Sequence, residues 1–285
     1  INQSVMKTII IINDSSTVAK HAGELALQIA RKINTNLLVA NTVIKSSPNP
    51  VKELVFVSAG EDIETEDAAG LAGHLELLNQ SEQTKDIFKP EIREVDISEY
   101  NEADLIQLII KNNIWMIVKG LAKTPMINHD AKAINIHTVL NRVNCPLLLV
   151  PGKFCLKELE RIVYMADLRY CRMQVVNQLV ELAKPYHASL MVAHVSAKGM
   201  PHIEEKYADA CFNESVADKI NYDHLIFNNI KDRSSQNVLD VMENEMQIDL
   251  IAVVNHRFHF EEIVGGYITD ILPEHITVPL MVFPI

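Results

Sequence analysis

The sequence lacks the features that mark membrane, exported and nucleic-acid-binding proteins. It has only four cysteines, none of them in a Cys-x-x-Cys pair, and 26 basic against 37 acidic side chains, for a net charge of -11. No apolar run approaches the roughly 20 residues that span a bilayer, and no basic segment followed by an apolar one marks an export signal. Negative charge repels phosphate backbones and anionic lipid. We therefore expect free thiols, a cytoplasmic location and no binding to nucleic acid or membranes.

Hydrophobic residues are plentiful, and they recur in the same order in both halves of the chain. They make up 48% of the 285 residues, which is enough apolar surface for two cores. The apolar run that ends at Asp14 returns as the run that ends at Asp167. Three further pairs of segments follow in the same order: 37–40 with 190–193, 114–118 with 248–252, and 145–151 with 278–284. We predict two copies of one domain, residues 1–152 and 153–285.

Each predicted copy alternates short apolar runs with segments of helical periodicity. Continuous apolar runs are typical of parallel strands that are buried on both faces. We expect helices after Asp14 and Asp167, with Ser15 or Ser16 as the first N-cap, and further helices at 102–111, 136–142, 236–245 and 267–272. Third strands are expected at 91–97 and 224–228. The sequence thus predicts an α/β fold with two doubly wound, open, parallel five-stranded sheets of strand order 3-2-1-4-5.

Candidate site residues follow the strands, because ligands of such sheets bind at the carboxyl ends of the strands. In the first copy these positions are Asp14, Asn41 and the loop from Gly120. In the second copy they are Asp167, His194 and the loop from Val254.

These patterns resemble two universal stress protein domains in tandem. The similarity rests on the apolar strand that ends in Asp, an Ala-rich helix, the strand Leu190–Val195 and the final Cys145–Val150 segment. It implies an adenine nucleotide alpha hydrolase-like fold and a last strand that pairs across a dimer. In this chain, segments 146–150 and 279–283 would then pair antiparallel, which makes an intramolecular pseudo-dimer. A homodimer and an unidentified protein partner remain open.

The chain departs from the family's phosphate-binding loop, G-x2-G-x9-G-[S/T]. The first copy presents Gly120, Lys123, Ala133 and Ile134 at the four motif positions. The second copy presents Val253 or Val254, His256, Gly266 and Tyr267. A Cβ atom in place of a glycine hydrogen blocks the approach of a phosphate and disfavours positive φ. We therefore expect no certain cofactor, and ATP or AMP remains an alternative.

The remaining polar candidates have two interpretations each. Asp14 and Asp167 could accept hydrogen bonds from a ribose, or they could cap the following helices. Lys123 could contact an anion or be a solvated loop residue. The predicted strand order would bring Asp167, His194 and His256 to one edge, where they could bind zinc, although the His256-x-x-His259 pair is expected in a loop and lacks the helical register of zinc hydrolases. We expect no metal.

No catalytic signature is present, because the sequence has no G-x-S-x-G elbow, no P-loop and no G-x-G-x-x-G after a strand. We predict a non-enzymatic stress-response protein that binds or senses through two degenerate nucleotide-type pockets. One alternative is an adenine-nucleotide-binding protein with weak ATP hydrolysis. Another is a variant that binds a metal or an apolar ligand lined by Phe258, Phe260 and Tyr267.

Overall fold

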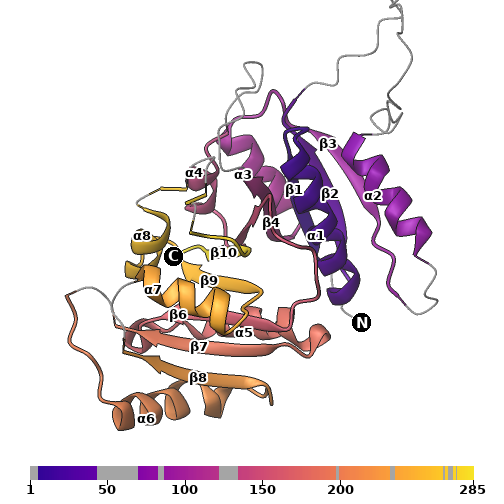
Figure 1. The fold of residues 1–285 in the computed structure, drawn as a ribbon. Coiled ribbons are helices and arrows are strands. Elements are labelled where there is room, and N and C mark those ends of the chain that lie inside the picture. Colours follow the sequence, from indigo (N-terminus) through magenta and orange to yellow (C-terminus); the bar gives the residue numbers. More distant parts are fainter. Residues whose placement is uncertain are drawn as a thin grey trace, which may run out of the picture.

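Strands and helices alternate along the chain in the computed structural model (Figure 1). The structure describes residues 6–43, 70–82, 87–121, 134–196, 199–231, 235–265, 267–268, 272–273 and 275–285. The strands are β1 (Thr8–Asn13), β2 (Asn36–Asn41), β3 (Ile92–Asp96), β4 (Ile114–Leu121), β5 (Leu147–Pro151), β6 (Arg161–Ala166), β7 (Ser189–Val195), β8 (Leu225–Ile230), β9 (Leu250–Val254) and β10 (Leu280–Phe283). The α-helices are α1 (Thr17–Ile33), α2 (Gly70–Ser81), α3 (Glu102–Lys111), α4 (Ile136–Leu140), α5 (Met173–Ala183), α6 (Glu205–Ser215), α7 (Ser235–Asp240) and α8 (Phe258–Val264). Short 3-10 turns are η2 (Leu168–Tyr170), η3 (Lys184–Tyr186) and η4 (Ala217–Lys219), and η5 (Val241–Glu245) is a π-helical turn.

All ten of these strands form one sheet, in the order β3-β2-β1-β4-β5-β10-β9-β6-β7-β8. The expectation of two separate five-stranded sheets is therefore wrong. Within each half the strands follow the expected 3-2-1-4-5 order, and all pairs there are parallel. The division of the chain at residues 152 and 153 remains a prediction.

The two halves join through the antiparallel pairing of β5 with β10, in which Leu149 lies opposite Leu280 and Leu147 opposite Val282. All four side chains are completely buried. An unpaired strand at the edge of a sheet exposes N–H and C=O groups that invite other chains. The pairing removes two such edges at once, which is the physical reason that one continuous sheet replaces two.

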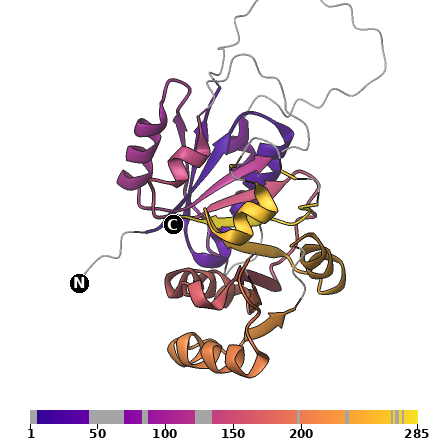
Figure 2. The same ribbon diagram turned by 90° about the vertical axis from the view of Figure 1, so that its left-hand side faces the viewer.

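The central strands are buried on both faces, as the continuous apolar runs predicted. Every residue of β1 is buried, and the buried hydrophobic side chains of both halves form one connected cluster. Figures 1 and 2 show β3 and β8 at opposite ends of the molecule, with helices packed along the sheet. Trp115 and Met116 of β4 belong to this core. Burial also raises the pKa of the Cys145 thiol to about 12, which makes it a structural rather than a reactive group.

Helix α1 begins directly behind the end of β1. Ser16 is its N-cap, and the Ser16 hydroxyl oxygen accepts a hydrogen bond from the backbone N–H of Ala19 at 3.1 Å. The helix ends at Asn34, which has left-handed backbone angles. Its apolar face packs against β1, β4 and β5. This arrangement places the N-terminus of α1 over the carboxyl ends of the first-half strands.

The structure confirms most of the predicted helices and corrects one. Helix α3 spans the predicted residues 102–111 and begins with a capping box formed by Asn101 and Asp104. No helix is present at Tyr267, Ile268 and Leu272, and the rest of that predicted segment lies outside the described residues. The helix of this region is α8, which starts nine residues earlier. Its apolar residues Phe260 and Ile263 are buried and three positions apart, which provides the core-facing side.

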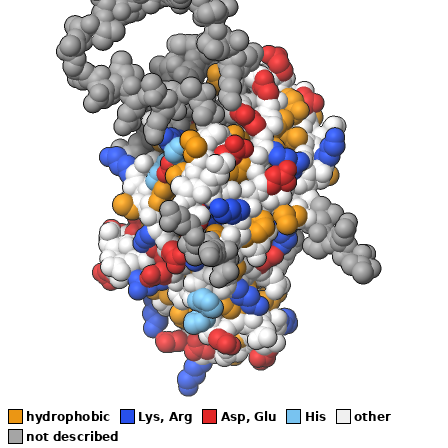
Figure 3. All heavy atoms as spheres, turned by 90° about the vertical axis from the view of Figure 1, so that its right-hand side faces the viewer, with side chains coloured by type: hydrophobic (Ala, Val, Ile, Leu, Met, Phe, Trp, Pro, Cys, Tyr) orange, Lys and Arg blue, Asp and Glu red, His pale blue; other side chains and the backbone are white. Residues whose placement is uncertain are grey.

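Acidic and basic side chains are interspersed over the face in Figure 3, with hydrophobic side chains scattered between them. Basic residues form no continuous patch on that face, which agrees with the excess of acidic residues in the sequence. None of the helices in the described ranges combines the length and apolar character that crossing a membrane requires.

Candidate functional site

The first-half candidates lie at the ends of β1, β2 and β4, and their polar groups contact one another or the chain. Asn41 is 8% exposed, and its side-chain oxygen accepts a hydrogen bond from the Asn13 amide at 2.7 Å. The Asn41 amide donates to the Glu94 carboxylate at 2.6 Å. These three side chains therefore form a ladder across β1, β2 and β3.

The carboxylate of Asp14 forms hydrogen bonds at the N-terminal end of α1. Its carboxylate accepts hydrogen bonds from the backbone N–H of Ser16 at 3.0 Å and from the Ser16 hydroxyl. Ser15 between them has a φ of 63°, a left-handed conformation that closes the turn. These contacts agree with the capping interpretation of Asp14. Its contact with a ribose remains a prediction.

Gly120 lies where β4 passes beneath the first turn of α1. A Cβ atom at this position would lie 2.2 Å from the carbonyl oxygen of Val18. Only a glycine allows the strand and the helix to approach this closely. The packing of α1 therefore accounts for Gly120 without a phosphate. Two other predicted site residues, Lys123 and Gly266, lie outside the described residues.

In the second half, the carboxylate of Asp167 is buried and paired with Arg169. The side chain of Asp167 is 2% exposed. The Nε of Arg169 donates to one carboxylate oxygen at 2.7 Å, and its Nη2 donates to the other. Arg169 also donates to the backbone oxygen of Pro201 at 3.2 Å. The Asp167 carboxylate raises the pKa of Arg169 through their hydrogen bonds, so the guanidinium stays charged.

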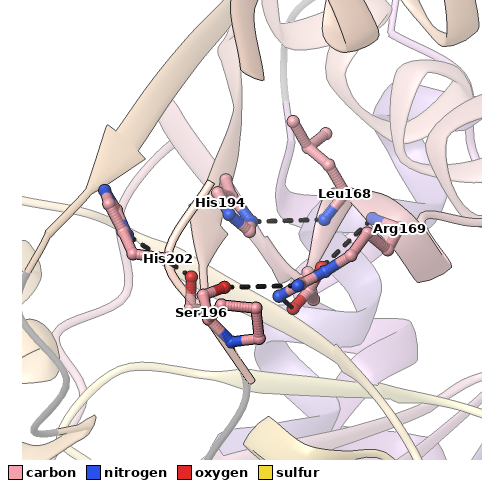
Figure 4. Close-up of polar contacts among 7 residues, drawn as sticks. Leu168, Arg169, His194, Ser196 and His202 are labelled. Atoms are coloured by element: carbon pink, nitrogen blue, oxygen red, sulfur yellow. Dashed lines mark hydrogen bonds and ion pairs between the residues drawn. The ribbon is translucent and has the colours of Figure 1, made fainter. Parts of the chain in front are cut away.

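His194 lies beside this ion pair and is completely buried. Its Nδ1 accepts a hydrogen bond from the backbone N–H of Leu168 at 3.2 Å (Figure 4). This contact places the proton of the neutral ring on Nε2. Burial lowers the pKa of His194, and the nearby Asp167 carboxylate opposes that shift only in part. The ring is therefore neutral at pH 7.

The crevice at Asp167 is almost filled by the chain itself. The cavity there has a volume of about 20 Å³ and is lined by Tyr164, Met165, Ala166, Asp167, Tyr170, Val254, Arg257 and His259. One water molecule needs roughly 10–15 Å³ on this measure. Tyr170 and Arg257 stack over its rim, with the guanidinium carbon 5.7 Å from the ring centre. Among the described residues, the crevice has room for about one water.

The sequence correctly predicted that Asp167 and His194 lie together, but His259 rather than His256 joins them. His259 is 4% exposed on α8, and burial lowers its pKa to about 4 against the opposing influence of Asp167. The interpretation of the His-x-x-His pair as part of a loop is therefore wrong for His259. It is on a helix because α8 starts immediately after the turn that follows β9.

His256 lies at the junction between the two halves. Its ring centre is 4.9 Å from that of His137 on α4, in an edge-on arrangement. Burial and the neighbouring His256 both lower the pKa of His137. Beside them, the buried amide of Asn255 donates to the side-chain oxygen of Asn141 at 2.7 Å, which links β9 to the end of α4. His256 thus belongs to the contact between the halves.

The arrangement of these histidines does not form a metal centre. The described ranges contain no group of three or more His, Cys, Asp or Glu side chains that could hold a metal ion. The proton on Nε2 of His194 also prevents that nitrogen from acting as a ligand. Of the proposed apolar lining, Phe260 is buried and Tyr267 is 71% exposed, while the side chain of Phe258 lies outside the described part.

The sequence analysis missed Arg169, Arg257 and Tyr170. Arg169 follows Asp167 by two residues, and an arginine at that spacing can reach back to the carboxylate when the chain makes a 3-10 turn. The spacing of Asp167 and Arg169 in the sequence could have indicated this ion pair. It does so only if the 3-10 turn η2, rather than the start of an α-helix, is known to follow β6. Nothing in the sequence pattern places Arg257 over Tyr170.

We predict that Gly120→Ala destabilises the protein because its Cβ would overlap the backbone of α1. The free energy of unfolding, measured by urea denaturation, should fall by roughly 2 kcal/mol or more. Gly23→Ala is the matched control, since its new Cβ would meet only the flexible ends of Leu71, at 3.1 Å, and Leu75, at 3.5 Å. An unchanged stability of Gly120→Ala would show that this glycine is not required for packing.

We predict that His259 makes stability depend on pH. A histidine has a pKa near 6.5 in the unfolded chain and about 4 in the folded one. Between these values the unfolded chain binds more protons, so stability is full above pH 6.5 and falls as the pH approaches 4. The loss from His259 between pH 7.5 and 4.5 should be roughly 2–3 kcal/mol.

The measurement compares urea unfolding of the wild type and His259→Phe at both pH values. The variant keeps a ring in the core but cannot titrate, so its loss of stability on acidification should be smaller by that amount. His137 and His194 are present in both proteins, so their contributions to the pH dependence cancel in the comparison. Equal losses in the two proteins would contradict the assignment of a neutral, buried His259.

Comparisons with known proteins identify the fold. A scan of the sequence against protein-family models gives no match, and no curated protein matches it. Among solved structures, a universal stress protein from Archaeoglobus fulgidus is similar at a TM-score of 0.57 and 13% identity, over 97% of this chain and 98% of that chain. A functionally unknown protein from Pseudomonas aeruginosa has a TM-score of 0.51 at 11% identity, over 98% and 92% of the two chains.

The cytoplasmic domain of a prokaryotic cation chloride cotransporter has a TM-score of 0.50 at 9% identity, over 97% of this chain and 94% of that domain. At such identities the similarity concerns the fold and not the activity. The chain therefore has the α/β fold of universal stress proteins, with a mostly parallel sheet.

Proposed function

We propose that this chain is a stress-response protein of the universal stress type that binds or senses without catalysis, and that its nucleotide-type pockets are degenerate. The observation that carries the proposal is the ion pair between Asp167 and Arg169 in a cavity of about 20 Å³. Pockets for small molecules and cofactors have volumes of roughly 300–1,000 Å³. An adenosine would have to displace Arg169 and leave the Asp167 carboxylate buried and unpaired, which is costly.

The first-half crevice supports the same proposal through different contacts. The groups that could contact a ribose there are already bonded, Asp14 to Ser16 and Asn41 to Asn13 and Glu94. Gly120 is already required for the close packing of β4 against α1. A ligand would therefore have to compete with three sets of contacts within the protein.

The titratable groups that the structure describes in the second-half crevice are not placed as a catalytic acid or base, which supports a role without catalysis. His194 and His259 are buried and neutral, and the carboxylate of Asp167 is neutralised by Arg169. The fold itself is not tied to one activity, since it also occurs as the cytoplasmic domain of a cotransporter. The four free thiols suit a reducing compartment, and we place the protein in the cytoplasm.

Equilibrium dialysis with radiolabelled ATP and magnesium tests the proposal, together with a sensitive phosphate-release assay. We expect no retention of ATP at micromolar concentrations, and equal phosphate release from the wild type and from Asp167→Asn. The variant distinguishes specific binding in the crevice from adventitious binding elsewhere. Micromolar binding that Asp167→Asn abolishes would show that the pocket is an ordinary nucleotide site and would overturn the proposal.

A further inference from the structure

Three histidines gather around the end of β7 in the second half. His194 lies on β7, His259 on α8, and His202 in the segment that leads into α6. The rings of His194 and His202 are nearly parallel, with their centres 6.5 Å apart (Figure 4). Burial lowers the pKa of His259, and the neighbouring His194 lowers it further. Neutral imidazoles can pack together in this way, but protonated ones repel one another.

The segment 199–204, which we name the strap, is held to the second-half crevice by three contacts. The Nη1 of Arg169 donates to the carbonyl oxygen of Pro201 at 3.2 Å. The Nδ1 of His202 lies 3.4 Å from the hydroxyl oxygen of Ser196, as Figure 4 shows. Ile203 is buried in the core. The strap is therefore tied both to the end of β7 and to Arg169.

Arg169 connects the strap to the buried carboxylate. Its Nε and Nη2 bind the two oxygens of Asp167, while its Nη1 binds the strap. It is also the second residue of η2, so its position depends on that turn. A change that removes Arg169 from Asp167 therefore also releases the strap.

The contact between His194 and Leu168 exists only while the imidazole is neutral. The Nδ1 of His194 accepts a hydrogen bond from the N–H of Leu168, the first residue of η2, at 3.2 Å. A proton on Nδ1 turns this acceptor into a donor, so that two N–H groups point at each other. Protonation thus breaks the contact that fixes η2, the turn that carries Arg169.

The charges around His194 favour an exchange of partners after protonation. Burial lowers the pKa of His194 most, while the Asp167 carboxylate and the carbonyl oxygen of Ala166 raise it. Arg169 and His202 lower it further. An imidazolium at this place is consequently attracted to Asp167 and repelled by Arg169. It can replace the guanidinium, which leaves the buried carboxylate paired.

We propose that protonation of His194 at Nδ1 releases Arg169 and the strap, so that mild acid opens the second-half crevice. The proton comes from solvent, the imidazolium takes the place of the guanidinium beside Asp167, and Arg169 turns into water with its charge unchanged. Acidification is then the signal of the sensing protein proposed above. The proposal rests on that function only for its biological role, because the opening requires no ligand.

The pH dependence of the opening has a definite sign. His194 is neutral in the closed form and accessible to water in the open form, where a histidine titrates at about pH 6.5. Below that pH the open form binds one more proton, and its population rises about tenfold per pH unit. A further proton on His202 or His259 acts in the same direction, because it repels the first.

Hydrogen–deuterium exchange of the full chain at pH 7.5, 6.0 and 5.0, corrected for the intrinsic pH dependence of amide exchange, tests the proposal. Protection in segments 168–171 and 199–204 should fall by roughly thirtyfold between pH 6.5 and 5.0. The amide of Leu168 reports directly, since it donates the hydrogen bond to His194. Strands β4 and β5 should remain better protected than both segments at each pH.

Two histidine-to-asparagine variants separate His194 from the other histidines. The side-chain oxygen of Asn in His194→Asn can take the place of Nδ1 and accept the Leu168 N–H, but it does not titrate. Protection of 168–171 should then change much less with pH than in the wild type. His187→Asn is the matched control, because His187 is exposed and has a φ of 52°, which asparagine tolerates. It should open like the wild type.

A measurement on the unaltered protein guards against a variant that folds poorly. Nitrogen NMR of the histidine rings should show His194 protonated on Nε2 alone at pH 7.5, and on both nitrogens with the same midpoint as the exchange.

Three results would overturn the proposal: unchanged protection of the wild type down to pH 5.0, the same acid response in His194→Asn, or exchange of both segments at the rate of β4 and β5. The last would mean that acid unfolds the whole chain. Micromolar ATP binding at neutral pH would refute the proposed degenerate pocket and leave this opening intact.

Discussion

The burial of the Asp167 carboxylate is the constraint that shapes the second-half crevice. A charged group that is removed from water must have a charged or hydrogen-bonding partner in a fixed position. Arg169 fulfils this requirement from two residues away, which holds η2 across the end of β6. The same turn directs the N–H of Leu168 to His194 and sets Tyr170 beneath Arg257. One ion pair thus fixes the turn that contacts His194 and accounts for a crevice with little free volume.

The two halves have the same strand order but close their crevices in different ways. In the first half α1 begins four residues after β1 and packs so tightly on β4 that Gly120 is required. In the second half η2 intervenes, and α5 begins farther from the strand. The antiparallel β5–β10 pair joins both halves into one sheet. It leaves β3 and β8 as the outer strands, of which only β3 is protected by charge.

Much of the fold could be predicted because its signals are local. The apolar runs predicted the strands, and helical periodicity predicted the helix after Asp14, with Ser15 or Ser16 as its cap, and the helix at 102–111. The contacts of the candidate site were harder to predict from the sequence, because they depend on tertiary structure. The proximity of Gly120 to Val18 joins positions far apart in the sequence, and the pairing of Arg169 depends on a turn that periodicity does not reveal. The same limit explains why a helix was expected after Gly266 instead of at α8.

A crystal structure of the protein grown with an excess of ATP and magnesium tests the central claim most directly. The closed-crevice account predicts density for the Arg169 guanidinium on the Asp167 carboxylate and no triphosphate beside it. Density for a nucleotide at Asp167, with Arg169 turned away into solvent, would contradict it.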